Sequence, residues 1–209
     1  NEEINLSWSR WYNYRLSRQI KKYFKLLLKL QVPNLYFCDT MDTSVFISKN
    51  FSPKKGKIIC ESPSNIALIK YWGKYGLQFP INPSLSFTLS NCKTKTSIDY
   101  SPRLKRQGNF DFFYDGKIKK SFENKIERFF ERIFPFCPYL ENLFLKINSK
   151  NTFPHSSGIA SSASAFSSLA FCIVSIEKRY FEGMSEKKFL SKVSFIARLG
   201  SGSGSRSIS

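Results

Sequence analysis

The residue types best suited to chemistry gather in a hydroxyl-rich segment near the middle of the chain, residues 153–164. Five serines fall within nine positions of this segment, which also holds Pro154 and Gly158. The apolar, alanine-rich stretch after it predicts a helix from about residue 159 to about residue 175. The first turn of a helix leaves backbone N–H groups unpaired at the positive end of its dipole. The segment therefore favours a phosphate site, since a helix cap alone would explain only one or two of the serines.

A second candidate group combines two cations with a phenol. Lys70, Tyr71 and Lys74 lie within five positions of one another. Such side chains can neutralise the negative charge that phosphoryl groups carry. The alternative is a solvated lysine pair around a buried Tyr-Trp pair, and in isolation this spacing favours that alternative.

A third segment, residues 200–207, alternates glycine and serine and then reaches Arg206. A flexible linker has the same composition. The segment directly follows a predicted helix, however, and it contains an arginine that suits a bidentate contact to a carboxylate. On these observations alone, the linker and the binding-site interpretations both stay open.

The elements that must position these groups belong to a mixed fold. The pattern predicts strands at residues 58–61, 85–92, 94–100, 110–114, 117–121 and 143–147, and helices at residues 122–134, 159–175 and 186–198. A turn is expected at residues 62–65, the strands at 85–92 and 94–100 are expected to pair, and Asp115-Gly116 should close a hairpin. Ser185 is the expected N-cap of the last helix. Strand-rich and helix-rich stretches without strict alternation indicate the α+β class.

The composition limits the chemical classes of binding partner but does not identify one partner. The 209-residue chain carries a formal net charge of +18, and its lysines and arginines are spread along the whole sequence. A basic balance favours anionic partners such as nucleotides, phosphorylated metabolites, nucleic acid or an acidic membrane. No block of like charge resembles a nucleic-acid-binding arm, so we expect no nucleic-acid partner.

Cysteine and histidine usage argues against metal and disulfide chemistry. The five cysteines are odd in number and scattered, and His155 is the only histidine. We therefore expect neither a zinc site nor a disulfide framework, and we expect no protein-bound metal. A reducing, cytoplasmic setting follows as the default. No apolar run approaches the length of a membrane span.

Residues 1–57 differ from the rest of the chain. Apolar residues recur at a helical period over residues 8–30, with lysines and arginines mostly on the other faces. Such a helix could lie on an anionic membrane, but packing on a domain or partner is the favoured interpretation. Residues 31–57 read as a linker, which places a domain at residues 58–209.

Two of these segments resemble known motifs. Residues 154–162 resemble the Pro-x-x-x-Gly-Leu-(Ala/Gly)-Ser-Ser motif of the galactose, homoserine, mevalonate and phosphomevalonate kinase superfamily, with Ile159 in the leucine place. Residues 65–74, Asn-Ile-Ala-Leu-Ile-Lys-Tyr-Trp-Gly-Lys, resemble the near-diagnostic motif of diphosphomevalonate decarboxylase. The resemblance continues in the family's order through residues 80–89, 94–96 and 197–207.

The resemblance implies a fold and a reaction. The fold would be the N-terminal lobe of the superfamily's two-lobed structure, a mixed sheet packed with helices. Family members use ATP and Mg²⁺ to phosphorylate the tertiary hydroxyl of mevalonate diphosphate, and loss of phosphate and carbon dioxide gives isopentenyl diphosphate. The implied partners are thus mevalonate diphosphate and ATP, and the parent protein would be a cytoplasmic homodimer.

The resemblance also assigns roles to residues. Lys70 would act in catalysis by stabilising charge near the reacting hydroxyl, while Tyr71 and Lys74 would hold the substrate diphosphate. The ATP phosphates would lie at Gly158, Ser161 and Ser162. The substrate's carboxylate and phosphates would lie at Ser201, Ser203 and Arg206.

Four positions are less clear. Ser84 and Ser86 match family serines, although strand packing explains them equally well. His155 lies in the phosphate segment without being required by the motif, and we interpret it as a loop residue. Leu199 replaces a basic residue of the family.

The 209 residues do not include the family's later half, with an aspartate near the substrate hydroxyl. We therefore expect an N-terminal half that has negligible decarboxylase activity alone. Two alternatives remain open. One is a related kinase of mevalonate or a derivative that does not decarboxylate, and the other is a non-catalytic basic protein that binds a membrane or a partner.

Overall fold

The computed structural model describes residues 42–70, 73–104, 108–154 and 158–208. The chain from Thr43 onward forms one compact unit. The amphipathic helix predicted at residues 8–30 lies outside the described residues, so its membrane and packing interpretations stay predictions. Within the described ranges, no helix is long and apolar enough to cross a bilayer.

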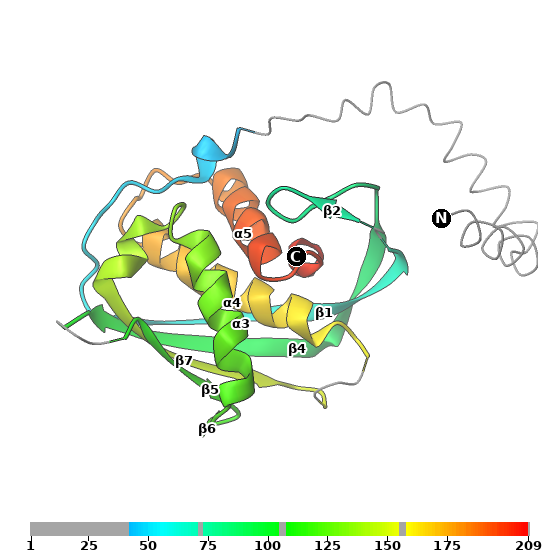
Figure 1. Cartoon of the computed structure of the whole chain (residues 1–209), viewed down its shortest axis with the longest axis horizontal. Coiled ribbons are helices and arrows are strands. Elements are labelled where there is room, and N and C mark those ends of the chain that lie inside the picture. Colours follow the sequence, from blue (N-terminus) through cyan, green and yellow to red (C-terminus); the bar gives the residue numbers. More distant parts are fainter. Residues whose placement is uncertain (1–41, 71–72, 105–107, 155–157, 209) are drawn as a thin grey trace, which may run out of the picture. The chain divides into compact units, whose positions relative to one another are not determined.

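A five-stranded sheet forms one layer of this unit (Figure 1). Its strands, in spatial order, are β1 (Gly56–Ile69), β4 (Leu85–Pro102), β7 (Leu143–Asn151), β5 (Phe110–Tyr114) and β6 (Lys117–Ile118). All neighbours are antiparallel except β5 and β7, which run parallel. On β7 the residues alternate between buried and more exposed, so one face of the sheet is covered and the other is not.

The two longest strands correct the sequence prediction. The turn predicted at residues 62–65 is wrong, because β1 runs unbroken through these positions. The two strands predicted at residues 85–92 and 94–100 form the single strand β4 and do not pair with each other; they pair with β1 instead. The strand pairing shifts its register between Pro63 and Ser64, and this shift accommodates the proline. A proline is tolerated at a bulge because its missing N–H costs no ladder bond there.

Three helices cover the buried face of the sheet (Figure 1). They are α3 (Lys120–Ile133), α4 (Ser161–Lys178) and α5 (Glu186–Gly200), and each overlaps a predicted helix. α4 packs on β1 and β4, α5 packs on α4, and α3 packs on α5. Ser185 caps α5 as predicted, because its hydroxyl accepts the Lys188 N–H at 3.3 Å. The predicted α+β class is confirmed.

The hairpin between β5 and β6 forms as the sequence predicts. Asp115 and Gly116 both have positive φ, 50° and 73°. Two consecutive residues with positive φ are typical of a type I′ turn, whose twist matches the twist of the two strands that it joins. The hairpin forms the edge of the sheet beyond β7.

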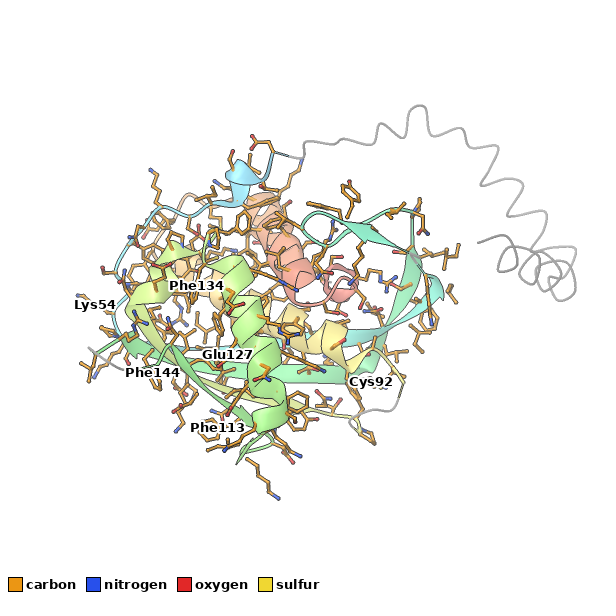
Figure 2. All side chains as sticks on the ribbon, viewed as in Figure 1. Lys54, Cys92, Phe113, Glu127, Phe134 and Phe144 are labelled. Carbon is orange, nitrogen blue, oxygen red and sulfur yellow. The ribbon has the colours of Figure 1, made fainter. Side chains whose placement is uncertain are left out.

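Phenylalanine dominates the core between the two layers. Phe129 of α3 packs on Phe166 of α4 with ring centroids 5.1 Å apart, and Phe110 of β5 stacks on Phe130 at 5.1 Å. Phe134, labelled in Figure 2, is partly buried and packs against this core.

The stretch before β1 also packs on the core. Phe46, in the 3₁₀ turn η1 (Thr43–Phe46), stacks on Phe195 of α5 with ring centroids 4.4 Å apart. Ser48 is buried beside an ion pair between Lys192 of α5 and Glu177 of α4, whose charged atoms are 2.7 Å apart. The domain boundary predicted at residue 57 stays a prediction.

Candidate functional site

Two of the three candidate segments, and the part of β1 that leads into the third, meet at one end of α4. The Ser64 hydroxyl of β1 donates a hydrogen bond to the Ile159 carbonyl, just before α4 begins. The side-chain amide of Asn65 donates to the Ser207 hydroxyl at 2.7 Å. Ser207 ends the 3₁₀ turn η3 (Gly204–Ser207). Residues far apart in the sequence are therefore direct neighbours.

The start of α4 has the features of an anion site. Ala160, its N-cap residue, has a left-handed backbone with φ of 52°, and Gly158 has φ of 78°. These turns place the helix start at Ser161 rather than at residue 159. None of the described side chains caps the helix by a hydrogen bond. The Ala163 N–H donates to the Ala160 carbonyl at 2.8 Å, but no described residue accepts from the N–H groups of Ser161 and Ser162. The helix dipole favours a negatively charged ligand beside these two groups.

A row of hydroxyls extends from this helix start to the segment after α5. Ser162 is exposed in the first turn of α4, and its Oγ lies 3.5 Å from the Oγ of Ser201. The Oγ of Ser201 lies 3.2 Å from the Oγ of Ser203. The predicted phosphate segment and the predicted carboxylate segment thus share one surface. Ser161 is half-buried beside them.

The Gly-Ser segment is packed, unlike a linker of the same composition. Gly204 lies so close to α5 that an added Cβ would come 2.7 Å from the Ala197 carbonyl oxygen. An added Cβ at Gly200 would come 2.2 Å from the Phe166 ring. Arg206 is half-buried in η3, and its backbone N–H donates to the Ser203 carbonyl at 3.1 Å. The glycines therefore permit close packing that holds Arg206 in place.

The lysines of the second segment follow the C-terminal end of β1. Lys70 follows β1 directly and is exposed, and its carbonyl accepts from the Asn82 amide at 3.3 Å. Lys74 starts the short strand β2 (Lys74–Tyr75), which pairs with β3 (Phe79–Pro80). Its ammonium donates to the Gln78 side chain at 2.6 Å. Tyr71 and His155 lie outside the described residues.

The β2–β3 hairpin is tied to the rest of the site by an arginine. The Arg198 guanidinium of α5 lies 5.4 Å from the centre of the Phe79 ring. The hairpin that carries Lys74 thus packs beside the C-terminal end of α5, which leads into Ser201.

A layer of buried hydroxyls that the sequence analysis missed lies beneath the site. The Oγ atoms of Ser167 and Ser62 are 3.0 Å apart, and Ser167 also donates to the Ser207 carbonyl at 3.0 Å. Further pairs are Thr94 with Ser164 at 2.7 Å and Thr96 with Ser168 at 2.6 Å. Serine or threonine at every second strand position, and three or four apart on α4, is the signal that could have revealed this layer.

A cavity of about 110 Å³ opens beside the start of α4. Its wall is mostly apolar. Its lining includes Phe112, Tyr114, Phe122, Lys125, Ser161 and Ser162. Burial, and then the nearby Asp115 carboxylate, raise the pKa of the Tyr114 phenol, so this group stays protonated near neutrality. A flat aromatic group attached to phosphates would suit such a cavity.

Three other residues that the sequence analysis singled out, Ser84, Ser86 and Leu199, lie at or near strand and core positions. Ser84 and Ser86 are half-buried at the start of β4, where Ser86 pairs in register with Ala67. Leu199 is fully buried in the core. Its carbonyl accepts the Arg132 guanidinium at 2.9 Å. A charged side chain in the place of Leu199 would enter the core.

The described residues contain no group of three or more histidine, cysteine, aspartate or glutamate side chains that could hold a metal ion. A divalent cation at this site would therefore depend on oxygen atoms of a bound ligand and on serine hydroxyls.

Comparison with known proteins completes the description of the site. Residues 62–209 match the family model described as the diphosphomevalonate decarboxylase-like N-terminal domain. The chain is 35% identical over 158 residues to the diphosphomevalonate decarboxylase of Eremothecium gossypii, covering 70% of this chain and 38% of that protein. It thus spans about 40% of the length of the curated relatives that it matches.

Solved structures give the same result. The mevalonate diphosphate decarboxylase of Staphylococcus aureus matches with a TM-score of 0.60 and 31% identity, over 74% of this chain and 44% of that one. A structure described as MDDEF in complex with MVAPP, AMPPCP and magnesium matches with a TM-score of 0.59 and 31% identity, over 74% and 44% of the two chains.

Proposed function

The chain belongs to the diphosphomevalonate decarboxylase-like family, and we propose that it forms the part of an ATP-dependent decarboxylase that binds mevalonate diphosphate and the phosphates of ATP. The whole protein would phosphorylate the tertiary hydroxyl of mevalonate diphosphate and release phosphate, carbon dioxide and isopentenyl diphosphate. The observation that carries this proposal is the meeting of the motif segments, through Asn65 with Ser207 and through Ser162 with Ser201.

The start of α4 is the proposed site of the ATP phosphates. Ser161 and Ser162 offer hydroxyls beside their own backbone N–H groups, and Gly158 lets the backbone approach the ligand. The cavity beside these serines has room next to the phosphates for part of the nucleoside. ATP would supply the phosphoryl group that is transferred.

The segment after α5 and the two lysines are the proposed substrate contacts. Arg206 suits a bidentate contact with the carboxylate, while Ser201 and Ser203 donate from the same surface. Tyr71 and Lys74 would hold the diphosphate, and Lys70 would stabilise charge near the reacting hydroxyl. Phosphoryl transfer depends mostly on positioning and on neutralising spread negative charge, which is what such cationic and hydroxyl groups provide.

Magnesium fits this arrangement as a companion of the nucleotide. Since the described residues offer no carboxylate cluster, the ion would be held mainly by ATP oxygens, with serine hydroxyls nearby. It would neutralise phosphate charge as transfer proceeds.

The test is to incubate the complete protein that contains this chain with mevalonate diphosphate, ATP and magnesium, and to measure carbon dioxide release and product mass. We expect ATP-dependent carbon dioxide release and a product with the mass of isopentenyl diphosphate. A phosphorylated product without carbon dioxide loss would support the non-decarboxylating kinase instead. The 209-residue chain alone should show negligible activity, and robust carbon dioxide release by it would contradict that expectation.

A matched pair of variants tests the phosphate site. Ser162→Ala removes an exposed hydroxyl at the start of α4, whereas Ser191→Ala removes an exposed hydroxyl on α5 away from the serine row. Ser162→Ala should lower the affinity for ATP by about tenfold, the value of one hydrogen bond to a charged group, and Ser191→Ala should leave it unchanged. Equal ATP affinity in both variants would argue against the proposed role of Ser162.

A further inference from the structure

Two cysteines from different layers of the fold meet beside the buried hydroxyl layer. Cys60 of β1 pairs in register with Thr96 of β4. The Cys172 thiol of α4 donates to the carbonyl of that same Thr96 at 3.3 Å. The two thiols lie close enough for each to shift the pKa of the other. Cysteines far apart in the sequence are thus direct neighbours between the sheet and α4.

The two thiols differ in exposure and in acidity. Cys60 is half-buried, whereas Cys172 is fully buried. The hydrogen bond with Cys172 lowers the pKa of the Cys60 thiol, and Ser175 and Arg179 act in the same direction against the effect of burial. That hydrogen bond and burial raise the pKa of Cys172. Since the thiolate is the reactive form, Cys60 is the nucleophile of the pair and Cys172 its protonated neighbour.

We propose that Cys60 and Cys172 form a peroxide-sensitive thiol pair that closes into a disulfide between β1 and α4. In the first step the Cys60 thiolate attacks hydrogen peroxide, the O–O bond breaks, and a sulfenic acid and hydroxide form. In the second step the Cys172 sulfur attacks the sulfenic sulfur, the S–O bond breaks, and water leaves. The Cys172 proton leaves in that water, and the hydroxide of the first step takes up the proton that Cys60 lost on ionisation. The two thiols are together oxidised by two electrons, and one peroxide is reduced to two waters.

The position of the bridge gives it a structural consequence. Cys60 lies two residues before Ser62, whose hydroxyl contacts Ser167 of α4. A covalent link here fixes β1, which carries Asn65, to α4, which begins at Ser161. Oxidation would thus tie together the two elements that meet at the candidate site. The thiol chemistry itself does not depend on the proposed decarboxylase function.

Peptide mapping tests the proposal directly. The folded, reduced 209-residue chain is treated with hydrogen peroxide, alkylated with N-ethylmaleimide in denaturant, and digested without reductant. We expect a crosslinked peptide pair holding Cys60 and Cys172, which disappears when dithiothreitol is added before alkylation. The crosslink should become the main oxidised species before Cys137 is modified. Full alkylation of both cysteines after peroxide, or a main crosslink between another pair, would overturn the proposal.

Substitutions of single cysteines test whether this pair forms the crosslink, as opposed to oxidation of the cysteines in general. In Cys172→Ser, Cys60 should stop at the sulfenic acid and become labelled by dimedone, while Cys60→Ser should leave Cys172 reduced. Cys92→Ser and Cys137→Ser should form the crosslink as the wild type does. Cys92, labelled in Figure 2, lies within β4, and Cys137 is fully buried. Loss of the crosslink in Cys92→Ser would indicate disulfide exchange through Cys92 and would overturn the direct route.

Discussion

The side-chain amide of Asn65 donates a 2.7 Å hydrogen bond to the hydroxyl of Ser207, 142 positions later in the sequence. Both residues are buried, Asn65 at 1% exposure and Ser207 at 0%. Asn65 lies in β1 next to Ser64, which reaches the loop before α4. One strand therefore holds both the phosphate segment and the turn that carries Arg206. The relative position of the proposed ATP and substrate contacts depends on these few polar contacts.

Ser167 makes a second contact with the turn that carries Arg206, and removal of the Ser167 hydroxyl should loosen that turn locally. Ser167→Ala loses hydrogen bonds to the Ser207 carbonyl and to Ser62, and each buried bond contributes about 1 kcal/mol. We expect faster amide hydrogen exchange at residues 204–208. Ser168→Ala is the matched control, because Ser168 is equally buried on α4 but bonds to Thr96 and not to the turn. Equal exchange in both variants would contradict a positioning role for Ser167.

Gly204 should tolerate no side chain, for a steric reason. Its added Cβ would come 2.7 Å from the Ala197 carbonyl oxygen, a backbone atom that cannot rotate away. We expect Gly204→Ala to destabilise the fold by about 1 to 3 kcal/mol, measured by urea denaturation. Gly183→Ala provides the contrast, since nothing lies within 4 Å of its added Cβ. That variant should be neutral or stabilised by about 0.4 to 1 kcal/mol, and a similar loss in both would disprove the packing argument.

The sequence predicted the parts of this fold that depend on local chemistry. The helices at residues 122–134 and 186–198, the Ser185 cap and the Asp115-Gly116 hairpin are confirmed, because periodicity, capping and turn geometry are encoded within a few residues. The family was also predicted from motif order, and the comparisons confirm it.

The sequence predictions were wrong or incomplete where contacts between residues far apart in the sequence determine the structure. Residues 62–65 contain a proline and two serines and read as a turn, but pairing with β4 keeps them in a strand. The buried serines of α4 read as polar positions without a partner. Their partners on β1 and β4 become visible only when the sheet and helix are placed together. The roles of the individual site residues stay predictions.

Cys137 should make stability depend on alkaline pH. Burial raises the pKa of its thiol from 9.0 to about 11 in the folded chain. The unfolded chain ionises first, so the stability linked to this thiol is complete below pH 9 and is lost as the pH rises toward 11. The loss should be about 2 to 3 kcal/mol. Urea denaturation of the wild type and of Cys137→Ala between pH 9 and pH 11 measures this loss. The free energy of unfolding should depend less on pH in the variant. An equal pH dependence in both proteins would contradict the prediction.

The buried ion pair of α5 and α4 should be sensitive to the loss of one partner. Lys192 lies 2.7 Å from the Glu177 carboxylate, and both side chains are almost fully buried, at 2% and 7% exposure. Lys192→Met would leave Glu177 buried without its cation, which costs about 3 to 5 kcal/mol. The exposed pair of Lys178 and Glu186 is the control, because Lys178→Met should cost about 0 to 1 kcal/mol. Adding Glu177→Leu to Lys192→Met should recover part of the loss in denaturation experiments, since the uncompensated buried charge is then gone; no recovery would show that packing rather than charge is responsible.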